Sequence, residues 1–85
     1  MPPTLFSEPY ALLLKVLVDA RRRAGLRQID LADRLGKPQS FVSKFERGER
    51  RLDLVEFVIV ARAIGVDEME LVRSVAKRIP ARARL

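Results

Sequence analysis

The chain has 85 residues, with 17 lysines and arginines, 11 aspartates and glutamates, and neither cysteine nor histidine. A chain of this length supports one small hydrophobic core, and its net charge of +6 favours a polyanionic partner such as nucleic acid. The missing cysteine and histidine remove disulfides, thiolate metal sites and the commonest general base, so an enzyme is a poor interpretation and no cofactor is expected.

Charge is unevenly distributed along the chain. Residues 21–51 carry ten basic side chains against four acidic ones, whereas residues 52–72 are mainly acidic. From Arg73 onward every charged side chain is basic. The sequence therefore predicts a basic region next to an acidic one, followed by a basic C-terminal tail.

The first helix is expected over residues 8–24. Prolines at positions 2 and 3 prevent an earlier start, so residues 1–7 are expected to form an N-terminal arm. Ser7 provides a hydroxyl cap at the helix start, and Gly25 provides the left-handed residue that commonly ends a helix.

An apolar run at residues 11–18 is interrupted by Lys15. It is far shorter than the roughly 20 apolar residues that a membrane span requires. We therefore expect a cytoplasmic protein with no membrane association.

Residues 28–48 contain two short amphipathic segments divided by Gly36. Apolar residues recur in them at helical spacing: Ile29, Leu31, Ala32, Leu35, Val42 and Phe45. The second segment has a separate polar face formed by Gln39, Ser40, Ser43 and Lys44. This pattern predicts a helix-turn-helix, in which the second helix enters the DNA major groove.

Two further helices are expected after a polar loop at residues 49–52. Asp53 and Glu56 form a capping-box pattern that predicts a helix ending at Ile64, before a glycine. The same pattern at residues 67–70 predicts a last helix to about residue 78, before Pro80. The sequence thus predicts an all-α, compact five-helix domain over residues 8–79, with a basic tail at residues 80–85.

Together, these residues resemble the Cro and phage-repressor (XRE-like) helix-turn-helix family. The resemblance covers residues 17–71 and rests on Arg21 and three segments: GLRQIDLADRLG at 25–36, QSFVSKFERG at 39–48 and LVEFVIVARAIGVD at 54–67. Each segment alone is weak evidence, but the combination is specific. The resemblance implies the phage-repressor fold, with the helix-turn-helix at helices 2 and 3, and double-stranded DNA as the partner.

The resemblance also implies a role for individual residues. The outer face of helix 3 reads base edges in the family, which makes the expected base-contacting residues Gln39, Ser40, Ser43 and Lys44. Phosphate contacts, which fix the register of the protein on DNA, are expected from Arg27, Gln28, Lys37, Arg47, Arg50 and Arg51. Glu46 is expected to form a structural ion pair with Arg21 of the first helix.

Two positions depart from the family pattern. Pro38 replaces the usual serine or threonine at the start of helix 3, so the side-chain phosphate contact usual there is not expected. Phe41 replaces a small residue, and it either packs beside Phe45 or contacts a thymine methyl group. The basic residues at the C-terminal end either reach DNA or serve solubility: Arg78, Arg82 and Arg84.

The helix expected between Asp53 and Ile64 is more apolar than one inner face requires. Leu54, Phe57, Val60, Ala61 and Ile64 are expected to face the core, whereas the family usually has polar groups at the positions of Val55 and Ile59. We expect a subunit interface formed by Val55, Ile59, Val66, Met69 and Val72. The alternative is a broader core covered by the ends of the chain.

A homodimer with two recognition helices would require a pseudo-palindromic DNA site. The sequence therefore favours a dimeric repressor that regulates transcription. The alternative is an antitoxin-like or adaptor protein, which binds a protein partner and binds DNA secondarily.

Overall fold

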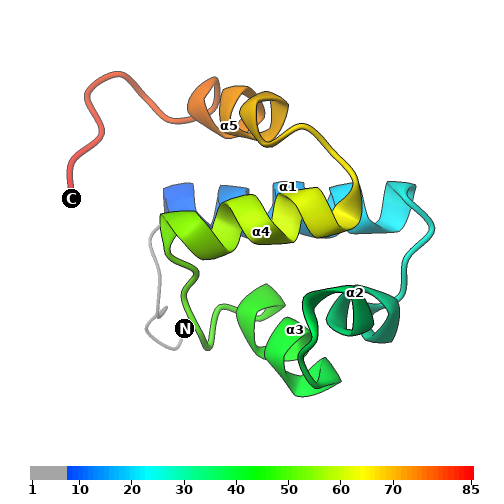
Figure 1. The fold of residues 1–85 in the computed structure, drawn as a ribbon. Coiled ribbons are helices and arrows are strands. Elements are labelled where there is room, and N and C mark those ends of the chain that lie inside the picture. The colour runs from blue at the N-terminus through cyan, green and yellow to red at the C-terminus, as the bar shows by residue number, and fades with distance from the viewer. Residues whose placement is uncertain (1–7) are drawn as a thin grey trace.

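The computed structural model describes residues 8–85. This part of the chain contains five helices and no strand: α1 (Glu8–Arg23), α2 (Gln28–Leu35), α3 (Gln39–Glu46), α4 (Leu54–Ile64) and α5 (Glu68–Ala76) (Figure 1). The prediction of an all-α, five-helix fold is confirmed. Helix α5 ends two residues before its predicted end. The predicted N-terminal arm and its Ser7 cap lie outside the described residues.

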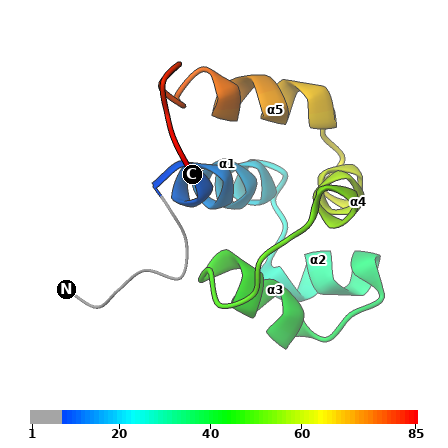
Figure 2. The same ribbon diagram turned by 90° about the vertical axis from the view of Figure 1, so that its left-hand side faces the viewer.

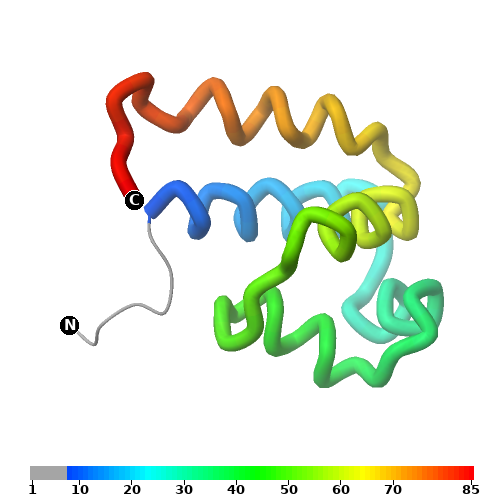
Figure 3. Tube along the Cα trace, turned by 60° about the vertical axis from the view of Figure 1, so that its left-hand side comes forward, coloured from blue at the N-terminus to red at the C-terminus, as the bar shows by residue number. Residues whose placement is uncertain are grey.

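The helices are arranged in three levels. Helices α2 and α3 lie on one side of α1 and α4, and α5 lies on the other side (Figures 1 and 2). The C-terminal tail runs back from α5 toward the start of α1 (Figure 3). The basic tail therefore lies on the side of the molecule away from the α2–α3 pair.

The core joins the α2–α3 pair to the rest of the domain. The largest fully buried side chains come from four helices: Leu17 of α1, Leu31 of α2, Val42 and Phe45 of α3, and Val60 of α4. The apolar stripes of α2 and α3 therefore face α1 and α4, and their polar faces are left to solvent.

One residue expected in the core is exposed. The buried residues of α4 are Phe57, Val60, Ala61 and Ile64, whereas Leu54 is 74% exposed. Leu54 is rotated by roughly 70° from the centre of this buried face, at 100° per residue along the helix. The prediction for Leu54 was therefore wrong, and its side chain extends the exposed apolar surface of α4.

Helix α2 begins without a hydroxyl cap, because Arg27 occupies the N-cap position. The carboxylate of Asp30 compensates by accepting a hydrogen bond from the backbone N–H of Arg27 at 2.8 Å. The same carboxylate accepts from Nε and Nη2 of Arg27, at 3.0 and 2.9 Å. A carboxylate one turn into the helix thus satisfies a backbone donor at the helix start in place of a hydroxyl cap.

Helix α4 begins with the predicted capping box. The Asp53 carboxylate accepts from the backbone N–H of Glu56 at 2.7 Å, and the Glu56 carboxylate accepts from the backbone N–H of Asp53 at 3.0 Å. Glu56 also forms an ion pair with Arg50, whose Nη2 lies 2.6 Å from Oε2. The start of α4 is therefore tied to the loop that follows α3.

Acid titration tests this arrangement. The hydrogen bond from Arg50, followed by that from the backbone of Asp53, lowers the pKa of Glu56 to about 2. Because the folded-state pKa is depressed, the stabilisation is fully present above the unfolded pKa and is lost as the pH falls through the folded pKa, between about pH 5 and pH 2. Glu56→Gln should lower the melting temperature at neutral pH and flatten its decline over this interval. The control is Glu70→Gln on α5, and an unchanged acid limb in Glu56→Gln would contradict the prediction.

Candidate nucleic-acid interface

A three-residue turn places α3 across α2. Gly36 ends α2 in the left-handed conformation, with φ +67°, which glycine adopts at little cost. The backbone N–H of Lys37 then donates to the carbonyl of Ala32 at 3.0 Å, which closes the helix end. Pro38 is extended and precedes the first residue of α3. The chain therefore changes direction sharply between the two helices. Helix α3 lies on the outside of the molecule, with its outer face toward solvent (Figure 1).

The two faces of α3 have different chemistry. Val42 and Phe45 are fully buried against the core. Gln39, Ser40 and Lys44 are exposed on the opposite side, and Ser43 beside them is half-buried. The structure thus brings the four predicted base-contacting residues together on one surface, which carries an amide, two hydroxyls and an ammonium group, all of them groups of the kind that pair with base edges.

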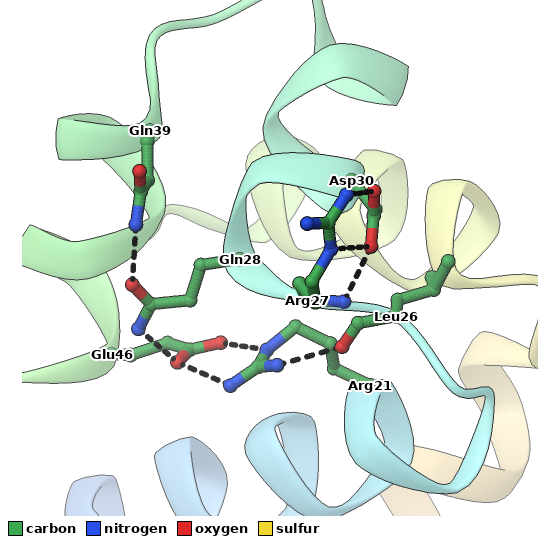
Figure 4. A network of polar contacts seen from close by, with 7 residues as sticks. All are labelled: Arg21, Leu26, Arg27, Gln28, Asp30, Gln39 and Glu46. Atoms are coloured by element: carbon green, nitrogen blue, oxygen red, sulfur yellow. Dashed lines mark hydrogen bonds and ion pairs between the residues drawn. The ribbon is translucent and has the colours of Figure 1, made fainter.

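A buried ion pair fixes the end of α3 to α1 (Figure 4). Arg21 Nε donates to Glu46 Oε2 at 2.7 Å, and Arg21 Nη2 donates to Glu46 Oε1 at 3.0 Å. Nη1 of Arg21 donates to the carbonyl oxygen of Leu26 at 2.8 Å. The side chains of Arg21 and Glu46 are only 8% and 7% exposed. Their charges therefore lie in a poorly solvated environment, in which each depends on the other.

Two glutamines extend this network toward the outer face of α3. Nε2 of Gln28, at the start of α2, donates to Glu46 Oε1 at 2.9 Å. Nε2 of Gln39 then donates to Gln28 Oε1 at 3.4 Å (Figure 4). A predicted base-contacting residue is thus connected to the buried ion pair through a predicted phosphate-contacting residue. Sequence reasoning missed this connection, because no helical spacing relates Gln28 to Gln39 or Glu46.

Two of the arginines predicted to contact phosphates lie beside carboxylates at opposite ends of the helix-turn-helix. Arg27 pairs with Asp30, and its hydrogen bonds lower the pKa of that carboxyl to about 2. Arg47 pairs with Glu49, lowers the pKa of that carboxyl, and donates to Ser43 Oγ at 2.7 Å. These carboxylates therefore remain ionised at neutral pH and orient the guanidinium groups beside α3.

The remaining cations contact aromatic rings. Arg50, which pairs with Glu56, has its guanidinium carbon 4.8 Å from the centre of the Phe41 ring. Lys37 Nζ lies 5.6 Å from the same ring centre. Arg51 stacks on Tyr10 of α1 at 4.1 Å. The loop after α3 is thus held against α1, α3 and α4 by stacking and ion pairing.

Apolar side chains are exposed on the other side of α4 and on α5. Val55 and Ile59 are 67% and 52% exposed, and Met69 and Val72 are 55% and 40% exposed. Val66 differs from these four, because it is partly buried and packs against the core. The structure therefore leaves four of the five predicted interface residues on the surface.

The exposed polar face of α3 and its support by α2 define a helix-turn-helix protein. Comparison with protein families agrees, because the HTH_3 helix-turn-helix family matches residues 17–71. The chain belongs to the XRE-type helix-turn-helix family, whose members are DNA-binding transcriptional regulators and not enzymes. Within residues 8–85, no helix is long and apolar enough to cross a membrane.

Similar proteins are found among solved structures and curated sequences. An XRE-family like protein from Pseudomonas syringae pv. tomato is 49% identical, with a TM-score of 0.80, over 85% of this chain and 88% of that chain. A Sinorhizobium fredii protein described as an uncharacterized HTH-type transcriptional regulator is 38% identical over 61% of this chain and 68% of its own length. The clp gene regulator of C. glutamicum shares the fold at 18% identity, with a TM-score of 0.75, over 91% of this chain and 100% of that chain.

The buried ion pair yields a test of stability. Glu46→Ala should leave the guanidinium of Arg21 buried without its partner, which costs about 3–5 kcal/mol in such sites. We expect a large fall in melting temperature, measured by circular dichroism. Glu49→Ala, which breaks the exposed pair with Arg47, is the control and should change the melting temperature little. A normal melting temperature with an altered base preference would show instead that Glu46 reads DNA.

Proposed function

We propose that the protein is a dimeric, sequence-specific repressor that acts in the cytoplasm and occupies a pseudo-palindromic operator at a promoter. The observation that carries this proposal is the division of α3 into an anchored inner face and an exposed polar outer face. Glu46 and Val42 hold the inner side. Placed in the major groove, α3 would direct its outer residues to base edges: Gln39, Ser40, Ser43 and Lys44.

We assign the surrounding polar groups to the DNA backbone. They lie at the start of α2, in the turn before α3 and in the loop after it: Arg27, Gln28, Lys37, Arg47, Arg50 and Arg51. A guanidinium has five N–H donors, so an arginine that bonds a carboxylate still has donors for a phosphate. These contacts would set affinity and register, and the outer face of α3 would set sequence preference.

The apolar surface of α4 supports a homodimer. Helix α4 contains only two charged residues among eleven, Glu56 and Arg62, and a helix that is apolar on nearly all sides is usually buried. We propose that a second copy covers Val55, Ile59, Met69 and Val72, with Val66 at the margin of the contact. Two-fold symmetry would then place two α3 helices about 34 Å apart, on successive turns of the major groove.

The second candidate function assigns the exposed apolar surface of α4 to a different protein partner. In an antitoxin-like or adaptor protein, the exposed face of α4 would bind another protein and DNA binding would be secondary. An open groove of about 380 Å³ beside this face favours that possibility, because its lining is mainly apolar and includes Leu54, Val72 and Ile79. Selection of DNA from a random pool with purified protein separates the two candidates. An inverted repeat supports the repressor, whereas binding without sequence preference supports the adaptor.

The two groups of DNA contacts should respond differently to substitution. Lys44→Gln should change the preferred base at one position in each half-site, with a discrimination of about 1–3 kcal/mol. Arg51→Gln should weaken binding to all sequences and reduce the slope of log K against log salt by about 0.9. Titrations at several salt concentrations, on the selected site and on an unrelated duplex, provide both measurements. A sequence-restricted effect of Arg51→Gln would contradict its assignment.

The dimer can be tested by placing charge on the α4 surface. Ile59→Glu should produce a monomer in analytical ultracentrifugation and weaken operator binding, because burying an unpaired carboxylate is unfavourable. Its melting temperature, measured under conditions where wild type is monomeric, should be almost unchanged, since Ile59 is 52% exposed. Arg22→Glu on the exposed side of α1 is the control. A wild-type monomer at high micromolar concentration would refute the dimer.

A further inference from the structure

The ring of Phe41 lies where two cations from different segments meet. Lys37, in the turn before α3, has its Nζ 5.6 Å from the ring centre, and Arg50, in the loop after α3, has its guanidinium carbon 4.8 Å from it. Phe45 holds the ring from the core side in an edge-to-face contact, with centroids 5.7 Å apart and an interplanar angle of 66°. One side chain of α3 therefore contacts basic residues from the segments on both sides of the helix.

Glu56 completes this cluster from α4. Its carboxylate accepts from Nη1 and Nη2 of Arg50 at 3.1 and 2.6 Å, and Nη1 also donates to the carbonyl of Arg51 at 3.1 Å. These bonds use three of the five donors of the guanidinium. The stacked, ion-paired arginine is thus held in one orientation and still has donors for an anion.

Phe41 points away from the base-contacting face of α3. At 100° per residue, its direction differs by roughly 130° from the centre of the surface formed by Gln39, Ser40, Ser43 and Lys44. Its ring is partly buried and borders a small hollow of about 150 Å³, which Glu56 and Ile59 of α4 also line. Of the two roles that the sequence allowed for Phe41, the structure therefore favours packing beside Phe45 over contact with a thymine methyl group.

We propose that Phe41 is a positioning residue, whose ring orients Lys37 and Arg50 toward two points on the DNA backbone and does not touch a base. This inference rests on the proposed function. Two long cationic side chains lose rotamer freedom when they bind phosphate, and a ring that restricts them beforehand reduces that loss. The aromatic residue would thereby raise affinity for all DNA sequences without changing base preference.

The test combines Phe41→Leu with Lys37→Gln and with Arg50→Gln in double-mutant cycles. Phe41→Leu should weaken binding to the selected operator and to an unrelated duplex by the same factor, about two- to tenfold for each cationic side chain that it leaves unrestricted. Its effect should shrink in the Lys37→Gln or Arg50→Gln background. It should stay unchanged in the control background Arg27→Gln, because Arg27 pairs with Asp30 and not with the ring. Additive effects in all three backgrounds would overturn the proposal.

A second experiment tests whether Phe41 contacts a thymine methyl group. Operator thymines are replaced one at a time with deoxyuridine, which lacks the methyl group. If Phe41 only positions cations, each replacement changes wild-type and Phe41→Leu binding equally. A Phe41→Leu defect that disappears at one replaced thymine would overturn the proposal. Phe41→Tyr keeps the ring face and should bind both duplexes like wild type, which separates loss of the ring from a folding defect.

The inference and the proposed function fail in distinguishable ways. Wild-type protein without sequence preference would refute the repressor, yet the cation–ring coupling can still be measured in the free protein. In that case, thermal unfolding of the same Phe41, Lys37 and Arg50 variants decides the inference. Coupled shifts in melting temperature support the positioning role, and additive shifts overturn it.

Discussion

The buried pair of Arg21 and Glu46 is the constraint on which the placement of α3 depends. Two charges with less than a tenth of their side-chain surface exposed lose much of their hydration, so each must be satisfied within the protein. The guanidinium bonds both carboxylate oxygens and the Leu26 carbonyl, and Gln28 adds a donor to the carboxylate. Among the described residues, no buried side-chain N or O atom lacks a partner. The cost of removing both charges from water offsets much of their attraction, and the two-point contact between the side chains restricts the orientation of α3 relative to α1.

Hydrogen bonds connect the buried ion pair to the outer surface of α3. Gln28 uses its amide nitrogen on Glu46 and its amide oxygen on Gln39, so the order imposed at the buried end of α3 extends to its first residue. Val42 and Phe45 fix the rotation of the helix about its axis, because both are fully buried. A surface that discriminates base edges needs side chains held in place by such supporting contacts. The core and the polar network thus act on the same helix from two sides.

Sequence reasoning succeeded at most points where structure is set locally. The capping box predicted at residues 67–70 was wrong, because the Asp67 carboxylate accepts from the backbone N–H of Met69 and not from that of Glu70. The turn at Gly36 and the capping box at the start of α4 each depend on a few neighbouring residues, and both are present in the structure. Sequence reasoning failed where segments distant in sequence meet. Leu54 was expected in the core but is exposed, because its burial depends on how α4 packs against the other helices. The ion pair between Arg50 and Glu56 was missed, because it depends on the path of the loop after α3. Arg34, which bonds the carbonyl of Ala63 near the end of α4, has no local signature for the same reason. The family resemblance supplied Arg21 and Glu46, which spacing alone would not have joined.

The ion pairs beside α3 also bear on how specificity arises. The carboxyls of Asp30 and Glu56 have pKa values of about 2, so at neutral pH they remain charged and partly neutralise Arg27 and Arg50. Non-specific DNA binding depends on the number of phosphates that cations neutralise, so this pairing reduces the affinity available for any sequence. An arginine that stays bonded to a carboxylate can also bond a phosphate. Its guanidinium is then held in a fixed orientation, but the ion pair brings less net positive charge to the DNA. In the proposed DNA complex, base edges would then supply a larger part of the binding free energy, which would give the outer face of α3 more control over the choice of site.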